Sequence, residues 1–297
     1  MLTRRVSLGR TAASIPGALG TPPNFHHGLL VLTLCLGVGA AAACAPPRPA
    51  LPSGPGAPMP AFESAFDDAT AACREVRTLA AELSFSGRAG GARVRGRVLV
   101  GLSRPSAVRL EGLAPFGPPG FIFVAQADRT ALLLPRDSRV LIGAPAADVV
   151  HALAGVSLSP DDLRYVLSGC VPVTVRPVRG RRYGDDWSVI ETTAGGAIYL
   201  RPVDDVQRIV AVRRAGLLSE YDDLTGRIPG RIRLTSVTPT TVPVALTVTL
   251  SQVRINTTLE PDVFTLDIPS GATSLTLEEL RAIGPLRPAA PTPAGGF

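Results

Sequence analysis

The chain has 297 residues, a formal net charge of +6 and four cysteines. Its 30 basic residues are all arginine, and alanine, glycine and proline are abundant, a bias typical of a GC-rich genome. The charge is therefore no argument for a nucleic-acid-binding protein, and the length suits one domain with a sizeable core.

Residues 28–43, "GLLVLTLCLGVGAAAA", form an uncharged apolar run that follows Arg4, Arg5 and Arg10. A basic segment, a short apolar run and small residues before a cleavage point are typical of a secretory signal. The run is short for a transmembrane helix and has no basic cluster after it. We therefore expect residues 1–43 to be a signal peptide that is removed.

The apolar run ends in "AAAC" at Cys44, which resembles a bacterial lipobox, although Ala41 stands where such motifs usually carry leucine. The resemblance implies that Cys44 is diacylated and anchors the mature protein. It also implies a lipoprotein of the outer membrane, on its periplasmic face. Plain cleavage by signal peptidase is the alternative.

Composition divides the remainder of the chain. Residues 44–60 are rich in proline and alanine, which predicts an extended tether behind the lipidated cysteine. Residues 287–297 have a similar composition and are expected to be a disordered tail. The folded domain is therefore predicted over residues 61–286.

Two cysteines remain in the predicted domain, Cys73 and Cys170. A secreted protein folds in an oxidising compartment, where such a pair favours a disulfide. Two buried free thiols are the alternative.

The first predicted element is a helix whose apolar residues recur at steps of three and four. Its stripe consists of Phe62, Phe66, Ala69, Cys73, Val76, Ala80 and Leu83.

The apolar period then changes to two. In "RVRGRVLVGL" the valines face one way and the arginines the other, which predicts a strand with one wet face. "GFIFVA", "ALLLP" and "RVLIG" are apolar at nearly every position, so that their second face must also be covered. Two short helices are expected at residues 145–155 and 159–169, the second with Ser159 as N-cap and Asp162 in a capping box. Further strands follow, from "VPVTVRP" to "VALTVTLSQVRIN".

This order of elements resembles the LolA/LolB superfamily of periplasmic lipoprotein carriers and receptors. The resemblance rests on "LSFSGR", on "RLEGLAPFGPPGFIFVA" and on "SRVLIGAPAADVVHALAGVSLSPDDLRYVLSGC", with Tyr165 where the receptors often carry tryptophan. It implies a mainly β fold: an incomplete antiparallel barrel of about 11–12 strands, with an N-terminal helix and short helices over its open mouth. It also implies a hydrophobic cavity for acyl chains and no cofactor.

Phe116 lies in a proline- and glycine-rich turn, where small or polar residues are usual. From the residues alone, its ring is expected to fold back onto the core. In receptors of the superfamily the corresponding loop carries an apolar residue outward to the membrane. That resemblance implies a membrane-insertion loop formed by Leu113, Pro115, Phe116 and Gly117, and both interpretations remain open.

The residues expected to line the cavity are drawn from the apolar strands, and ordinary core packing is the alternative for each. They are Leu99, Leu110, Ile122, Val124, Leu133, Ile142 and Trp187.

The sequence offers little for catalysis. His151 is the only histidine of the predicted domain, and no Gly-x-Ser-x-Gly elbow, metal-binding spacing or phosphate-binding glycine loop occurs. We therefore expect neither catalytic nor metal-binding residues. Arginines 176, 179, 181 and 182 form a basic loop that either meets anionic lipid headgroups or is simply solvated.

The sequence thus predicts a non-enzymatic, monomeric lipoprotein that binds membrane lipid or the acyl chains of lipoproteins, for transport or insertion at the membrane. A periplasmic carrier protein is an expected partner, and nucleic acid is not. The alternative is a structural or sensory periplasmic lipoprotein that does not transport lipid and binds a protein partner.

Overall fold

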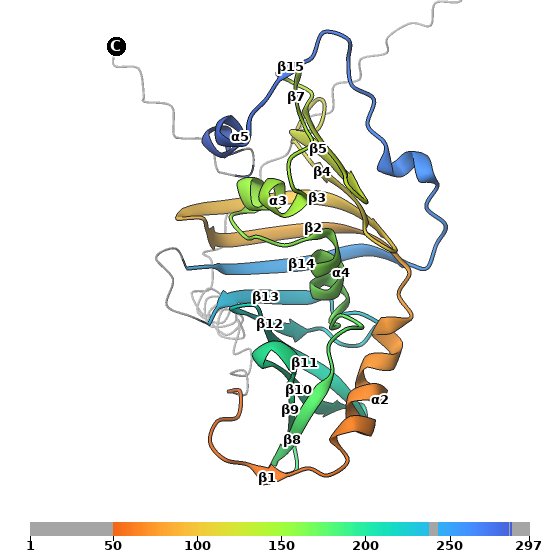
Figure 1. Ribbon diagram of the computed structural model, residues 1–297, viewed down its shortest axis with the longest axis vertical. Coiled ribbons are helices and arrows are strands. Elements are labelled where there is room, and N and C mark those ends of the chain that lie inside the picture. Colours follow the sequence, from red (N-terminus) through yellow and green to blue (C-terminus); the bar gives the residue numbers. More distant parts are fainter. Residues whose placement is uncertain (1–49, 238–242, 285, 287–297) are drawn as a thin grey trace, which may run out of the picture. The chain divides into compact units, whose positions relative to one another are not determined.

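The computed structural model describes residues 50–237, 243–284 and 286, and the expected leader, Cys44 and residues 287–297 lie outside them. From Leu51 onward these residues belong to one compact unit. It contains a single large sheet and four α-helices, so the fold is mainly β (Figure 1). Among the described residues, no helix is both long and apolar enough to span a membrane.

The strands alternate in direction along most of the chain, as short turns between amphipathic segments predict. They are β1 (Ala57–Pro58), β2 (Thr78–Ala89), β3 (Ala92–Ser103), β4 (Ala107–Gly112), β5 (Phe121–Gln126), β6 (Arg129–Leu134), β7 (Arg139–Ile142), β8 (Pro177–Tyr183), β9 (Trp187–Thr192), β10 (Gly196–Val203), β11 (Val206–Arg214), β12 (Leu217–Asp222), β13 (Arg231–Ser236), β14 (Ala245–Ile255) and β15 (Thr273–Ser274).

All these strands share one sheet, in the order β1-β8-β9-β10-β11-β12-β13-β14-β2-β3-β4-β5-β6-β7-β15. The two halves of the chain meet where β14 pairs with β2, antiparallel, with Val248 opposite Phe85. The edge strands β1 and β15 do not pair with each other, so the sheet is open. The prediction of about 11–12 strands is too low, because the described residues contain 15, of which two are only two residues long.

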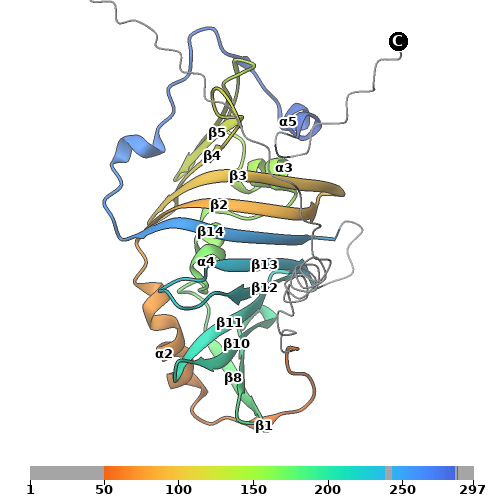
Figure 2. The same cartoon turned by 180° about the vertical axis from the view of Figure 1, so that it is seen from behind.

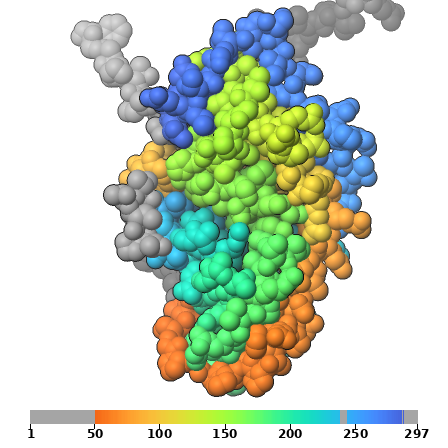
Figure 3. Space-filling view, viewed as in Figure 1, coloured from red at the N-terminus to blue at the C-terminus, as the bar shows by residue number. Residues whose placement is uncertain are grey.

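Three helices pack on one face of the sheet, which we call the inner face, and a fourth follows the last strand. They are α2 (Phe62–Arg74), α3 (Ala146–Ala154), α4 (Pro160–Ser168) and α5 (Leu277–Ile283). In the space-filling view of this side, the green segment that includes α4 covers the middle of the sheet (Figure 3). The opposite face is called the outer face, and no described helix crosses it over β14, β2 and β3 (Figure 2).

The core lies between the inner face and the helices. Phe66 of α2, Val149 of α3 and Leu167 of α4 pack with the inward residues of the strands in one large apolar cluster. Close approach of α2 to β8 depends on Gly180, because a Cβ atom there would lie 2.2 Å from the Cβ of Phe62.

The outer face of β4–β6 is covered by the chain that follows β14. This segment contains the short 3₁₀-helix η3 (Pro261–Phe264), and Phe264 is buried there together with Val124. Arg109 donates hydrogen bonds of 3.0 Å to the carbonyl oxygens of Val263 and Thr265. The second apolar face of these strands is therefore covered, as their sequence predicted.

The N-terminal end of the described chain is also bound to the sheet. Residues 57–58 pair with β8 as β1, and the Tyr183 hydroxyl donates to the Gly54 carbonyl over 3.0 Å. Met59 is buried. The end of the expected tether, from about Gly54, is thus part of the folded unit.

Three local predictions are wrong. The first helix ends at Arg74 rather than near Leu83, because Leu79, Ala81 and Leu83 alternate toward the core as part of β2. The basic loop around residues 176–182 is largely the strand β8, in which Arg179 pairs with Glu191 over 2.7 Å on β9. The segment "VPVTVRP", expected to be a strand, mostly precedes β8.

The disulfide prediction is confirmed. Cys73 at the end of α2 is joined to Cys170, which follows α4, with a Cα–Cα distance of 5.6 Å. Both cysteines are buried. The bond ties the N-terminal helix to the end of the helical segment that lies between the two halves of the sheet.

Candidate functional site

An apolar cavity of about 110 Å³ lies between the inner face of the sheet and the helices α3 and α4. Every residue that lines it is apolar. The strands contribute Leu83, Phe85, Val98, Leu110, Phe121, Leu234, Leu246 and Val248, and the helical segment and the C-terminal end contribute Val150, Leu153, Ala154, Val156, Leu158, Leu163, Val166, Leu167 and Leu286. Since no polar group would be left without a partner, the cavity suits a hydrocarbon chain.

The cavity is roofed by α3 and α4, which we call the lid helices. Their ends follow from local sequence: Gly155 and Gly169 end the two helices in the left-handed region, at φ +71° and +67°. At Gly155 a Cβ atom would lie 2.5 Å from the backbone nitrogen of Gly90, so glycine also allows α3 to touch the β2–β3 turn. The lid is thereby fitted closely against the sheet at one end.

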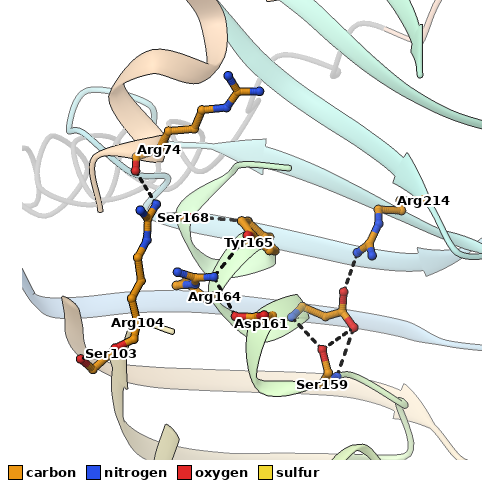
Figure 4. Close-up of polar contacts among 10 residues, drawn as sticks. Arg74, Ser103, Arg104, Ser159, Asp161, Arg164, Tyr165, Ser168 and Arg214 are labelled. Atoms are coloured by element: carbon orange, nitrogen blue, oxygen red, sulfur yellow. Dashed lines mark hydrogen bonds and ion pairs between the residues drawn. The ribbon is translucent and has the colours of Figure 1, made fainter. Parts of the chain in front are cut away.

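A polar contact holds the start of α4 to the sheet (Figure 4). The Asp162 carboxylate accepts hydrogen bonds from the backbone nitrogen of Ser159 at 3.2 Å and from its hydroxyl at 2.7 Å, which confirms the predicted capping box. The same carboxylate lies 2.5 Å from Arg214 of β11. Asp162 thus caps the helix and pairs with the sheet at once, and we call this contact the lid latch.

The charge of Asp162 is maintained by its neighbours. Burial is the largest single influence and raises the pKa of the carboxyl, but the hydrogen bonds from Arg214 and Ser159 and the charge of Arg214 together hold the pKa below its usual value. The carboxylate is therefore ionised at neutral pH and the latch is intact there.

Arg164 is the charged residue buried most deeply in the lid. Its guanidinium donates to Asp161 over 2.7 Å and lies 4.8 Å from the centre of the Tyr165 ring (Figure 4). None of its atoms lines the apolar cavity.

Of the residues predicted to line the cavity, the structure brings only Leu110 to it. The strand register shows why the predicted strand residues do not line the cavity. Ile122 lies opposite both Glu111 and Leu133, and cross-strand neighbours share a face. Glu111 belongs to the outer face, so Ile122 and Leu133 do as well.

The other predicted positions on these strands share that outward direction. Val124 lies opposite Arg109, and Ile142 is 65% exposed. Leu99 also faces outward, opposite Glu111, with 40% of its surface exposed. The prediction was wrong because a run that is apolar at every position does not reveal which half of its residues faces the helices.

Trp187 is likewise not part of the cavity. It begins β9 and packs on a separate small cluster that contains Val189 and Tyr199. The Arg201 guanidinium lies 5.0 Å from the centre of the indole ring. This side chain therefore anchors the outer side of the second half of the sheet.

Apart from Leu110, the cavity wall comes from residues that were not predicted to line it, above all those of the lid and of the strands β13 and β14. A signal for the lid was present, since Val150 and Leu153, like Leu163 and Val166, recur at helical spacing on short helices. No local signal indicates that β14, near the end of the chain, pairs beside β2 and so completes the wall.

The Phe116 side chain is 87% exposed. Its loop, which runs from residue 113 to residue 120, is nonetheless held in place. The backbone nitrogen of Leu113 donates to the Arg97 carbonyl over 2.8 Å, and the Arg136 side chain donates to the carbonyl oxygens of Phe116 and Pro118. The ring is thus displayed by a supported loop and does not fold back onto the core.

In the part of the chain that the structure describes, no group of three or more His, Cys, Asp and Glu side chains could hold a metal ion. His151 lies on α3 with its side chain exposed.

Comparison with known proteins gives structural likeness alone. No protein-family model matches the sequence, and no curated protein does either. The chain is similar in structure to a LolA superfamily protein from Nitrosomonas europaea, with 12% identity, a TM-score of 0.45, and coverage of 70% of this chain and 98% of that one.

Two further solved structures are similar. A DUF1329 family protein from Desulfovibrio piger has 13% identity and a TM-score of 0.44, covering 68% of this chain and 96% of that one. A putative outer membrane lipoprotein-sorting protein domain from Vibrio parahaemolyticus has 14% identity and a TM-score of 0.39, covering 64% and 89%. The superfamily that the sequence resembles is thus among these likenesses.

Proposed function

We propose that this protein binds a lipid, or the acyl chains of a lipid-modified protein, between the inner face of its sheet and the lid helices. It then releases this cargo at a bacterial outer membrane. The observation that supports the proposal most directly is the cavity, which has an entirely apolar wall and a roof of two short helices.

The energetics favour a hydrocarbon occupant. Each methylene group moved from water into such a wall contributes about 0.8 kcal/mol. A polar ligand would lose its hydrogen bonds to water and find no replacement among the lining side chains.

The volume indicates that the lid must move. The cavity measures about 110 Å³, whereas pockets for drug-sized ligands measure roughly 300–1,000 Å³. A long acyl chain therefore enters only when α3 and α4 shift away from the sheet, while the disulfide at Cys170 keeps the end of the lid attached to α2.

Two further features fit delivery at a membrane. The exposed Phe116 ring, in the loop formed by Leu113, Pro115, Phe116 and Gly117, suits the interfacial zone of a bilayer. An acylated Cys44 would keep the domain near that bilayer, and a periplasmic carrier would supply the cargo.

Cavity filling tests the proposal. Ala154 of α3 lines the cavity, so the ring in Ala154→Phe would occupy part of it. Ala147→Phe is the matched control, because Ala147 lies on the same helix and does not line the cavity. We expect mass spectrometry of organic extracts to find lipid with the wild type and the control, and much less with Ala154→Phe. Absence of lipid from all three, or equal amounts in all three, would contradict the proposal.

The modest cavity volume favours one other candidate, a structural or sensory lipoprotein whose interior remains closed and whose surface binds a protein partner. In that case the wild type carries no lipid. Ala154→Phe then changes only the thermal stability.

A further inference from the structure

The outer face of β2 and β3 carries three arginines whose charges no described residue neutralises. The side chains of Arg88, Arg93 and Arg95 are exposed, and none makes a hydrogen bond or ion pair with a described residue. The arginines of β8 differ, since Arg179 and Arg181 share the carboxylate of Glu191. Three arginines without a described partner thus gather on one face of the β2–β3 hairpin.

Register places two of these arginines in an unfavourable arrangement. Arg88 lies directly opposite Arg93, on the same face of the antiparallel pair, and Arg95 follows two residues later on that face. Like charges directly opposite one another destabilise a sheet. An anionic ligand at this position would remove that repulsion.

A groove of about 600 Å³ begins beside Arg95 on the same face. Its floor carries the hydroxyl groups of Ser84, Ser86, Thr247 and Thr249, and Arg95 and Arg97 also line it. Hydroxyls and guanidinium groups are the donors that bind phosphate oxygens. The charge of Arg97 is partly neutralised, because its Nε lies 2.6 Å from the Glu82 carboxylate.

The wall of this groove connects it to the Phe116 loop. Leu113, Ala114 and Pro115 line the groove, and the exposed Phe116 follows at once. An aromatic side chain next to phosphate-binding donors matches the layering of a bilayer surface, where acyl chains lie beneath phosphate headgroups.

We propose that the outer face of the β2–β3 hairpin, with the adjoining groove, is a docking surface for a bilayer rich in anionic phospholipid. Arg88, Arg93 and Arg95 attract the headgroups, and the groove binds a phosphate beside the inserted Phe116 ring. The inference of a docking surface rests on the proposed function only in assuming that the Phe116 loop contacts a membrane. It does not depend on which cargo the cavity holds.

The test compares two triple variants of equal charge. Arg88→Gln/Arg93→Gln/Arg95→Gln removes the docking arginines. Arg129→Gln/Arg182→Gln/Arg254→Gln removes three other exposed arginines whose side chains make no polar contact with a described residue. Both variants are made in the full chain with Cys44→Ala, so that an acyl anchor does not dominate binding, and both are checked for an unchanged melting temperature.

Binding is measured by sedimentation with vesicles of phosphatidylcholine, alone or mixed with phosphatidylglycerol. Each basic residue near an anionic surface contributes roughly five-fold, so the docking triple should lose on the order of 100-fold of the gain that phosphatidylglycerol provides. The control triple should retain most of that gain. High salt should abolish it, because the screening length falls from about 10 Å at 0.1 M to about 3 Å at 1 M.

Three results would overturn the inference. Equal losses in the two triples would show a general effect of net charge. Unchanged binding in the docking triple would show that this face has no membrane role. If the docking triple lost binding to a DNA oligonucleotide, measured in parallel, while its vesicle binding was unchanged, the surface would be assigned to a different polyanion. Lipid extracted from the docking triple should match the wild type, so failure of cargo binding remains separable from failure of docking.

Discussion

The disulfide between Cys73 and Cys170 allows a quantitative prediction. It closes a loop with a sequence separation of 97, and in the chain-entropy model such a closure stabilises the folded state by about 4.7 kcal/mol. Cys73→Ala/Cys170→Ala should therefore lower the free energy of unfolding by several kcal/mol. For a domain of this size, that loss corresponds to a melting temperature lower by roughly 10–20 °C.

Trp187 is the single tryptophan and lies partly buried against Arg201, so its fluorescence reports unfolding. Urea titrations would compare the wild type with the double variant, each with and without a thiol reductant. The reductant should shift the wild-type midpoint toward that of the variant and leave the variant unchanged. A loss of less than about 1 kcal/mol in the double variant would refute the entropic reasoning.

The same double variant also tests whether the disulfide restrains the movement of the lid helices, separately from its effect on stability. Neither cysteine lines the apolar cavity, so its wall is unchanged, while α4 loses its covalent link to α2. Under the proposed function, a fluorescent fatty acid should exchange faster from the double variant at a temperature where both proteins are folded. Equal exchange rates would show that the link does not restrain the lid.

Three further substitutions give sharp outcomes. Phe116→Glu should weaken vesicle binding without changing the melting temperature, because the ring is 87% exposed. Gly180→Ala should cost about 1–3 kcal/mol of unfolding free energy, measured in urea, since the new Cβ would lie 2.2 Å from the Cβ of Phe62. Arg214→Gln should cost about 1 kcal/mol at pH 7. Because the folded-state pKa of Asp162 is lowered, that difference should be present above about pH 4 and fade as the carboxyl is protonated at lower pH.

Each substitution has a control or a contrary result. Val206→Glu places the same charge on another exposed apolar residue, at 57% exposure, and should leave vesicle binding intact. Gly226→Ala meets only an ordinary contact of 3.6 Å and should be neutral. If the Arg214→Gln difference persisted unchanged near pH 3, the latch would not depend on the charge of Asp162.

The sequence was most informative where a local rule decides the structure. Ser159 and Asp162 predicted the capping box, and the alternation of valine and arginine in β3 predicted its buried face. Each of these signals lies within a few residues of the feature that it predicts.

Prediction failed where the deciding contact is distant in the chain. Ile122 and Val124 lie in an apolar run, and their direction depends on register with β4 and β6. Leu246 reaches the cavity only because β14 pairs with β2 across a long separation. The first helix, which was predicted to continue to Leu83, shows the same limit. Its last apolar residues fit both the helical spacing and the alternation of a strand, and only packing in the folded protein decides between the two.

The two covers of the sheet differ in how they are held. Under the proposed function, this difference favours the inner face as the side that opens. On the outer face, the Arg109 side chain donates hydrogen bonds of 3.0 Å to two carbonyl oxygens of the segment after β14, those of Val263 and Thr265. Lifting that segment would break both hydrogen bonds, and the pairing of β15 with β7 holds the chain beyond it.

On the inner face, the lid helices rest on the cavity through apolar side chains, with the latch at the start of α4 and the disulfide at its end. An acyl chain that enters beneath the lid helices would replace their apolar contacts with the sheet by apolar contacts with the chain itself. The main interaction lost on opening is then the ion pair between Asp162 and Arg214. That pair is partly exposed, and pairs of this kind contribute only about 0–1 kcal/mol. Under the proposed function, the lid is therefore the cover that a hydrophobic cargo displaces.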